Sequence, residues 1–289
     1  MAQVTVLGMG AMGARMAKSL LKAGHNVTVW NRDREKTLPL ADAGAKVAAT
    51  PRDAVGHAEF AISMLRDDEA ARQVWLDSAN GALARLPAHA IAIESSTVTV
   101  DWARELARAC LTRGIACIDA PVAGSRPQAD AAQLIYFVGG DAGTVAQAEF
   151  ILKAMGSAVH HAGPAGSGAA LKLIVNALFG VQVAALAELI GLMQCYGFDT
   201  VKAVEIIAST PVCSPAAKAA AGAMLARQYA PMFPLELVAK DFGYALAMAV
   251  ANNAPLPVAQ TAANVFAAAI DEGHGADNIT GVVQVYQDS

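Results

Sequence analysis

Three glycines near the start of the chain have the spacing of a phosphate-binding turn. Gly8, Gly10 and Gly13 follow a β-branched run, and an apolar pattern of helical period covers 11–22 before a second short strand at 27–30. In such a unit the first glycine permits the tight turn, the second lets the backbone approach a pyrophosphate, and the third allows close helix packing. The free amides at the helix start then face the phosphates. The pattern therefore predicts a dinucleotide-binding site rather than an ordinary βα turn.

The end of the second predicted strand indicates which dinucleotide binds. An NAD site usually has an acidic residue there, which accepts hydrogen bonds from the ribose 2′-hydroxyl. This chain has Asn31 and Arg32 instead. A guanidinium can bind a 2′-phosphate that a carboxylate would repel. Two alternatives stay open. In one, Asp33 binds the ribose from a position shifted along the chain; in the other, Arg32 is a solvated charge of the loop. We expect NADP(H) to be the preferred cofactor.

A lysine and an asparagine stand four residues apart in a strongly apolar helical segment. Lys172 lies among aliphatic residues without an acidic neighbour in sequence, and Asn176 follows one turn later on the same face. Partial burial disfavours an ammonium ion and lowers the pKa of a lysine, which suits proton donation near neutral pH. The alternative is a lysine whose stem lies along the helix while its charge reaches solvent. On one face, the two side chains can converge on a single small ligand.

Further segments complete a pattern that spans the chain. ESST at 94–97 ends a predicted strand, DAPVAGS at 119–125 follows the next one, and GSG at 166–168 opens the helix of the lysine. Together with the glycine turn, and continuing through 233–235 and 240–241, these motifs resemble the 3-hydroxyisobutyrate dehydrogenase (β-hydroxyacid dehydrogenase) family. Within that family, the chain is most similar to the glyoxylate and succinic semialdehyde reductases.

This resemblance implies a 6-phosphogluconate dehydrogenase-like oxidoreductase. Lys172 would protonate the carbonyl oxygen while NADPH delivers hydride to the carbon, and Asn176 would hold that oxygen. The residues expected to bind the cofactor are Gly8, Met9, Gly10, Ala11, Met12, Gly13, Asn31, Arg32, Met64, Leu65, Thr97 and Lys240. Those expected to bind the substrate are Ser96, Val122, Ala123, Gly124 and Asp241. Asp241 is also a candidate for orienting Lys240 or Lys172. For Ser96 and Asp241 the alternative is a capping or solvated role.

Ala123 departs from the family pattern, which usually has serine at this position. In the family that hydroxyl contacts the carboxylate of the substrate. Loss of one hydrogen bond to a charged group typically costs ~1.5–3 kcal/mol, roughly ten- to a hundredfold in affinity. Either the backbone amides around Ala123 and Gly124 suffice, or the substrate lacks a carboxylate there.

Three functions follow from these residues. The first is NADPH-dependent reduction of a small aldehyde or ketone, of semialdehyde or glyoxylate type. The second is reduction of an imine or an uncharged ketone, which Ala123 favours and Lys172 disfavours. The third is a non-catalytic NADP-binding module, against which the intact lysine, asparagine and glycine turn argue.

The secondary structure that must position these residues changes along the chain from alternating strands and helices to helices alone. Strands are predicted at 46–49, 60–64, 90–94, 116–119, 134–138 and 158–160, with helices between them. Such alternation implies a doubly wound, largely parallel Rossmann-type sheet covered on both faces. Helices alone follow, at 167–197, 200–208, 215–226, 234–252, 258–272 and 277–286. We expect an NADP-binding Rossmann domain over 1–162, an all-helical substrate and dimerisation domain over 163–289, and a long interdomain helix.

Composition bears on partners and compartment. With a net charge of −4 and no long basic run, nucleic acid is not an expected partner. Hydrophobic residues make up 55%, but polar residues interrupt the most apolar segment, 171–193, so no membrane partner is expected. The N-terminus runs directly into the first strand without room for a signal peptide, which predicts a cytoplasmic protein. The cysteines, Cys110, Cys117, Cys195 and Cys213, lack metal-ligand spacing and are expected to be buried free thiols, with no metal site.

The helical half has more apolar surface than so small a domain can bury. Ala184, Ala185, Ala187 and Gly191 would let another helix pack closely. The alternative is the core of one helical domain. We expect a homodimer or higher homo-oligomer joined through residues beyond 163.

Overall fold

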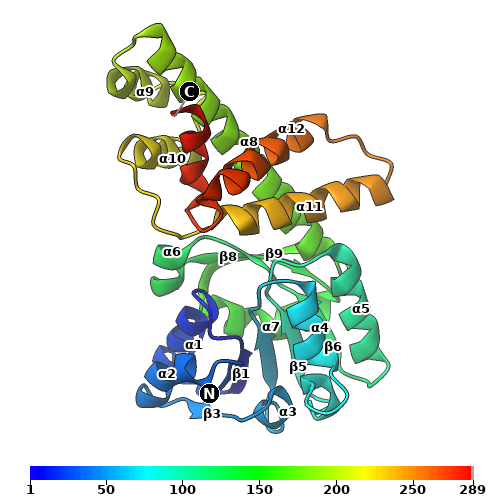
Figure 1. The fold of residues 1–289 in the computed structure, drawn as a ribbon. Coiled ribbons are helices and arrows are strands. Elements are labelled where there is room, and N and C mark those ends of the chain that lie inside the picture. Colours follow the sequence, from blue (N-terminus) through cyan, green and yellow to red (C-terminus); the bar gives the residue numbers. More distant parts are fainter. Residues whose placement is uncertain (288–289) are drawn as a thin grey trace. The chain divides into compact units, whose positions relative to one another are not determined.

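The computed structural model describes residues 1–287 (Figure 1). The chain divides into two compact units, Met1–Lys172 and the residues from Leu173 onward. This division lies within the long helix α8 (Ser167–Tyr196), later than the change of sequence pattern near residue 163. A mostly parallel sheet with flanking helices, followed by helices, confirms the predicted fold class.

The first unit is built on a nine-stranded sheet with the order β3-β2-β1-β4-β5-β6-β8-β7, in which β9 also pairs with β8. All pairs are parallel except those of β8 with β6 and β7. The strands are β1 (Gln3–Leu7), β2 (Asn26–Trp30), β3 (Lys46–Val47), β4 (Phe60–Ser63), β5 (Ile91–Glu94), β6 (Ala116–Asp119), β7 (Val122–Ala123), β8 (Leu134–Gly139) and β9 (Gly156–Gly163). The helices are α1 (Gly13–Lys22), η1 (Arg34–Thr37), α2 (Leu38–Asp42), α3 (Pro51–Ala54), α4 (Asp68–Leu76), η2 (Ala82–Ala84), α5 (Val100–Leu111), α6 (Arg126–Asp130) and α7 (Ala142–Lys153).

Side chains alternate between the two faces of this sheet because successive residues of a strand point in opposite directions. In β4, Ile62 joins the core formed with Leu20 of α1 and with residues of α7. Ala61 joins the opposite core, formed with Trp75 of α4 and Trp102 of α5. Small side chains on the sheet thus leave room for two tryptophans, which agrees with the close packing of protein interiors.

Five neighbouring parallel strands of the first unit end at a common level. The residues Trp30, Leu7, Ser63, Glu94 and Asp119 are paired in this order and are the last residues of β2, β1, β4, β5 and β6. This row is the carboxyl edge, the part of an open α/β sheet at which ligands bind. The loops that leave it contain most of the residues predicted to bind the cofactor.

The second unit is helical and has its own hydrophobic core. Besides the greater part of α8, it contains α9 (Thr200–Ala208), α10 (Pro215–Leu225), α11 (Leu235–Ala251), α12 (Pro257–Ala269), η3 (Ile270–His274) and η4 (Ile279–Tyr286). Phe242 of α11 packs against Phe266 of α12 with ring centroids 5.7 Å apart, and a Cβ on Gly180 would lie 2.5 Å from the ring of Phe242. Glycine in α8 therefore makes room for this aromatic pair.

Two details of the helical half differ from the sequence prediction. The segment predicted as a helix over 258–272 is an α-helix only to Ala269 and continues as the short π-helix η3, which contains Gly273 at φ +95°. The predicted last helix is the tighter 3₁₀ helix η4. The cysteine prediction is also wrong in part. Cys110 is buried, but Cys117 and Cys213 are only partly buried, and Cys195 is exposed, since the last turn of α8 extends beyond the buried part of the helix.

Helix α8 is long and apolar enough, by length and composition alone, to cross a membrane, with a mean hydropathy of 2.0 in its most apolar window. The polar interruptions in its sequence therefore do not exclude a span by themselves. Core helices of proteins without membrane spans have the same properties, and the buried residues of α8, such as Val183 and Ile190, belong to the core of the second unit.

Candidate active site

The turn after β1 has a geometry that requires glycine. Gly8 adopts φ +102°, and a Cβ there would lie 2.5 Å from the carbonyl oxygen of Met64 and 2.8 Å from Leu65. A Cβ on Gly13 would overlap the carbonyl oxygen of Gly8, whereas Gly10 has open space around it. Gly8 and Gly13 therefore permit close packing, and Gly10 leaves the backbone accessible to a ligand.

Helix α1 begins at this turn without a side chain that caps it. The N-cap residue Met12 makes no side-chain hydrogen bond, and the first turn contains no acidic residue. The first N–H groups of a helix need acceptors from outside the helix, and phosphate oxygens fill this role. The turn and the helix start thus fit the pyrophosphate of a dinucleotide.

Asn31 braces the glycine turn against the end of β2. Its Oδ1 accepts a hydrogen bond from the N–H of Met9 (2.9 Å), and its Nδ2 donates to the carbonyl oxygen of Asp33 (2.8 Å). Arg32, between them, is exposed. The carboxylate of Asp33 caps η1 by accepting from the N–H of Glu35 (3.2 Å). Because it already has this partner, Asp33 is the weaker candidate for the ribose end of the cofactor.

The loops after β4 and β5 are joined by a hydrogen bond. The N–H of Leu65 donates to Oγ of Ser96 (2.8 Å), and Ser96 is fully buried. Met64, Leu65 and Thr97 are only partly buried. The Ser96 hydroxyl thus braces two loops that carry predicted cofactor ligands, and its predicted contact with the substrate stays a prediction.

Glu94, which sequence reasoning left without a role, is buried beneath these loops. Its Oε1 accepts from the N–H of Ser96 (3.0 Å), and its Oε2 accepts from the indole N–H groups of Trp75 (3.1 Å) and Trp102 (3.3 Å). Burial raises the pKa of Glu94, and hydrogen bonds from Ser96, Ser63 and Trp102 oppose the shift. These neutral donors join β5 to α4 and α5 through one side chain. The sequence signal that could have indicated this role of Glu94 is an acidic residue at the end of an apolar strand.

Asp119, at the end of β6, holds the start of α8. Its Oδ1 accepts from the N–H of Gly166 (2.7 Å) and its Oδ2 from the N–H of Ala169 (2.8 Å). Burial raises the pKa of Asp119, and these backbone hydrogen bonds oppose the shift. Lys172 is half-buried in the next turn of α8 and is the last residue of the first unit.

The predicted substrate loop lies on the antiparallel part of the sheet. Val122 and Ala123 form β7 and pair with Tyr136 and Ile135 of β8. Gly124 follows with φ +114°, a conformation that favours glycine. Ala123 is partly buried, and its methyl group offers no hydrogen bond. A carboxylate at this loop would have to bind backbone amides.

Within the second unit, Asn176 and two residues of α11 form a polar cluster. Nδ2 of Asn176 donates to Oδ2 of Asp241 (2.6 Å), and Nζ of Lys240 lies 2.9 Å from Oδ1 of the same carboxylate. Because a carboxylate only accepts, it fixes which end of the Asn176 amide faces it. Nζ of Lys240 also lies 4.5 Å from the ring centroid of Tyr244. Asp241 is buried and orients both Asn176 and Lys240.

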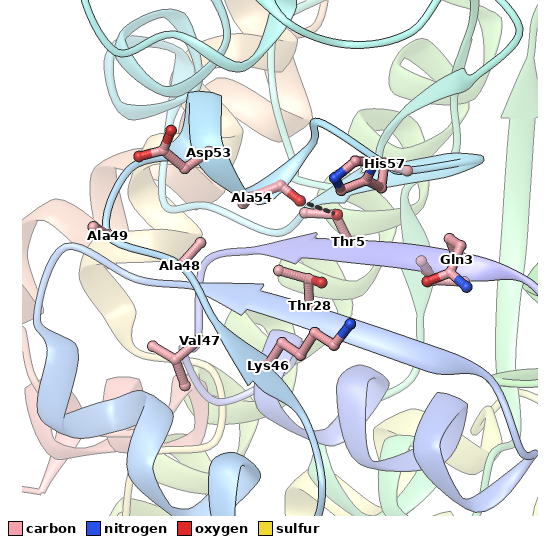
Figure 2. A pocket seen from close by; sticks show the side chains of 12 residues that line it. Gln3, Thr5, Thr28, Lys46, Val47, Ala48, Ala49, Asp53, Ala54 and His57 are labelled. Carbon is pink, nitrogen blue, oxygen red and sulfur yellow. Dashed lines mark hydrogen bonds between the residues drawn. The ribbon is translucent and has the colours of Figure 1, made fainter.

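A separate pocket of 370 Å³ lies over β1, β2 and β3 beside α3. Figure 2 shows Thr5, Thr28, Lys46 and His57 around it, with Oγ1 of Thr5 donating to the carbonyl oxygen of Ala54 (2.7 Å). Its lining contains none of the residues predicted to bind cofactor or substrate. We assign it no part in the reaction. Among residues 1–287, no group of three or more His, Cys, Asp or Glu side chains could hold a metal ion.

Known families match both halves of the chain. The NAD binding domain of 6-phosphogluconate dehydrogenase matches residues 3–163. The family described as NAD-binding of NADP-dependent 3-hydroxyisobutyrate dehydrogenase matches residues 166–286. The chain belongs to the 3-hydroxyisobutyrate dehydrogenase family. The resemblance inferred from the sequence motifs is thereby confirmed.

Individual members of the 3-hydroxyisobutyrate dehydrogenase family agree with this assignment. Glyoxylate/succinic semialdehyde reductase 2 of Arabidopsis thaliana is 33% identical over 278 residues, which cover 96% of this chain and 77% of that protein. The NAD-dependent L-serine dehydrogenase of Pseudomonas aeruginosa is 32% identical, with 99% and 98% covered. The structure of 3-hydroxyisobutyrate dehydrogenase from Mycobacterium tuberculosis with L-serine has a TM-score of 0.87 at 30% identity and covers 99% of both chains. The chain is therefore an NAD(P)-binding oxidoreductase.

Proposed function

We propose that this chain is an NADPH-dependent reductase of small aldehydes or ketones, with Lys172 as the general acid. The observation that carries the proposal is the attachment of α8 to the carboxyl edge of the sheet through Asp119. Lys172 follows in the next turn, and the glycine turn leaves the same edge. Hydride donor and proton donor must meet at one carbonyl group, so a shared edge favours this reaction.

When bound, NADPH would supply the hydride. Lys172 holds the proton and gives it to the carbonyl oxygen as negative charge develops there. Asn176, one helical turn later, has two amide N–H groups, one of which donates to Asp241. The second is the donor that we assign to the same carbonyl oxygen. Asp241 keeps the amide in the orientation that this requires.

We assign the 2′-phosphate of NADPH to Arg32. The guanidinium is exposed at the end of β2, where it can bind a phosphate bidentately. Asp33, the competing ribose ligand, caps η1. The glycine turn and the start of α1 would hold the phosphates, and Met64, Leu65, Thr97 and Lys240 are the remaining cofactor contacts in this proposal.

The substrate is a small carbonyl compound of semialdehyde or glyoxylate type, bound near Ser96, Val122, Ala123 and Gly124. A second candidate, an uncharged ketone or an imine, is favoured by one observation: the methyl group of Ala123 offers no hydrogen bond to a carboxylate. The intact lysine favours the carbonyl over the imine. A module that binds NADP without turnover is the third alternative.

Rates of NADPH consumption with a panel of compounds test the reaction. The panel contains glyoxylate, succinic semialdehyde, an uncharged ketone and a cyclic imine, each with NADPH and with NADH. We expect turnover of the carboxylate-bearing aldehydes with NADPH. Fastest turnover of the imine or the ketone would support the second candidate. Tight NADPH binding without turnover of any compound would leave the non-catalytic module.

We also propose that the protein is a cytoplasmic homodimer or higher homo-oligomer joined through the second unit. Helix α8 exposes large apolar side chains at positions that share one face of a helix. They are Ile174, Leu178, Leu189, Leu192 and Tyr196, each between 43% and 77% exposed. Several exposed large apolar side chains along one helix face are typical of a protein–protein contact.

A further inference from the structure

The start of α8 takes its cap from a distant part of the chain. The residue before the helix is Gly166, which has φ +90° and no side chain to accept a hydrogen bond. The carboxylate of Asp119 accepts from Gly166 N–H with one oxygen and from Ala169 N–H with the other, at 2.7 and 2.8 Å. A carboxylate at the N-terminus of a helix also interacts favourably with the helix dipole.

Backbone packing around this cap leaves little freedom for it to move. A Cβ on Gly168 would lie 2.7 Å from the carbonyl oxygen of Asp119 and closer still to that of Phe137. A Cβ on Gly139 would lie 2.5 Å from Oδ1 of Asp119. The start of α8 is therefore in direct contact with the ends of β6 and β8, and only glycine fits at these positions.

Asp119 also stands in the row of strand ends that forms the carboxyl edge. Its backbone belongs to the dinucleotide-binding sheet, and its side chain determines where α8 begins. Lys172 follows Ala169 within one helical turn, so the position of the cap sets both the height and the rotation of the lysine relative to the sheet. Lys172 is half-buried, which limits how far its side chain can compensate for a shifted backbone.

From this geometry we propose that Asp119 is a positioning residue, which fixes Lys172 with respect to the cofactor-binding edge. The inference rests on the proposed function of Lys172. Asp119 does not donate the proton itself, since both its oxygens accept backbone hydrogen bonds. A displacement of catalytic groups by about 1 Å can cost ~10²-fold in rate. Asp119 should therefore affect kcat rather than cofactor affinity.

The test compares Asp119→Asn with a cap variant elsewhere in the same unit, Asp141→Asn. Asp141 caps α7 by accepting from the N–H of Thr144 (2.9 Å), and α7 carries none of the predicted site residues. We expect Asp119→Asn to lower kcat ~10–100-fold, with an unchanged dissociation constant for NADPH. Asp141→Asn should leave kcat unchanged even if it lowers the melting temperature as much as Asp119→Asn does. Similar kcat values for both variants, or a loss that appears only as weaker NADPH binding, would overturn the proposal.

Amide hydrogen exchange separates this proposal from the proposed function. In Asp119→Asn, exchange should accelerate in the peptide that covers 166–172 and stay unchanged in peptides from α11. If the wild type turns over no carbonyl compound but this acceleration is seen, the proposed function fails while the anchor for α8 stands. Unchanged exchange in 166–172 would overturn the anchor itself. Asp119→Glu is the second variant: it retains the carboxylate but lengthens the cap, so a purely stabilising cap would keep full kcat and a positioning residue would not.

Discussion

The two units of this protein differ in how their large apolar side chains are covered. In the first, exposed ones such as Leu38, Leu111 and Phe150 lie on separate helices. In the second, large apolar side chains on one face of α8 are exposed, namely Ile174, Leu178, Leu189, Leu192 and Tyr196. The sheet unit is thus complete as a single copy, and the helical unit has a surface that suits a partner.

This difference also separates the expected tasks of the two units. The glycine turn, the strand ends and Lys172 belong to the first unit. Asn176, Lys240 and Asp241 belong to the second, where they form one hydrogen-bonded cluster. Substitutions in the glycine turn of the first unit should therefore alter cofactor binding, and substitutions on the exposed stripe of α8 should alter assembly.

Among the effects on binding and stability, the largest is expected for Gly13→Val. A side chain there would overlap the carbonyl oxygen of Gly8 and force the phosphate-binding turn open. We expect the affinity for NADPH to fall by more than ~100-fold, about 2.7 kcal/mol, in a fluorescence titration. The control Gly222→Ala, in α10 of the second unit, has open space for its methyl group and should bind NADPH normally. Near-normal affinity of Gly13→Val would show that the turn does not bind the cofactor.

A charge on the exposed stripe should weaken assembly next most strongly. Burial of an unpaired carboxylate in an interface costs ~2–5 kcal/mol, so Leu189→Glu should weaken self-association at least ~30-fold. Leu111→Glu, at an exposed leucine of α5 in the first unit, is the matched control. Light scattering at micromolar concentration measures both. A wild-type mass of 29.6 kDa would contradict the oligomer, and an equal effect of both variants would contradict the role of the stripe.

Removal of the Arg32 guanidinium should affect one cofactor only. A charge-assisted hydrogen bond to the 2′-phosphate contributes ~1.5–3 kcal/mol, so Arg32→Ala should lose about tenfold or more in NADPH affinity. NADH affinity should not change, because NADH lacks that phosphate. Arg34→Ala, two residues along the same exposed turn, controls for a general loss of positive charge. Equal losses for both dinucleotides would assign Arg32 to another role.

The smallest effect concerns the pH dependence of stability. Burial raises the pKa of Glu94 in the folded state. Folding then favours the protonated form, so this contribution to stability is complete below the ordinary glutamate pKa and is lost as the pH rises through the raised value. Glu94→Gln should remove that loss, amounting to ~1.4 kcal/mol for each unit of pKa difference. Urea unfolding followed by tryptophan fluorescence, to which the buried Trp75 and Trp102 contribute, measures it. A parallel pH dependence in both proteins would contradict this.

The sequence was informative where chemistry is local. Gly8, Gly10 and Gly13 are close together, and their turn, the flanking strands and the family motifs could be read directly. The roles of Glu94 and Asp119 could not be read in this way, because their partners are distant in sequence. Trp75 comes next to Glu94, and Gly166 next to Asp119, only once the sheet and its flanking helices have formed. The pattern of apolar and polar residues along the chain also could not show that Cys195 lies on an exposed turn or that η4 is a 3₁₀ helix.

Lys172→Ala tests the proposed chemistry most directly, with single-turnover reduction and NADPH binding measured on the same preparation. We expect NADPH affinity to be retained and kcat on the best carbonyl substrate to fall ~10²–10⁴-fold. Lys172→Arg should rescue poorly, because a guanidinium does not release its proton near neutral pH. If Lys172→Ala kept more than about a tenth of the wild-type kcat, a barrier change of only ~1.4 kcal/mol, Lys172 would not be the proton donor.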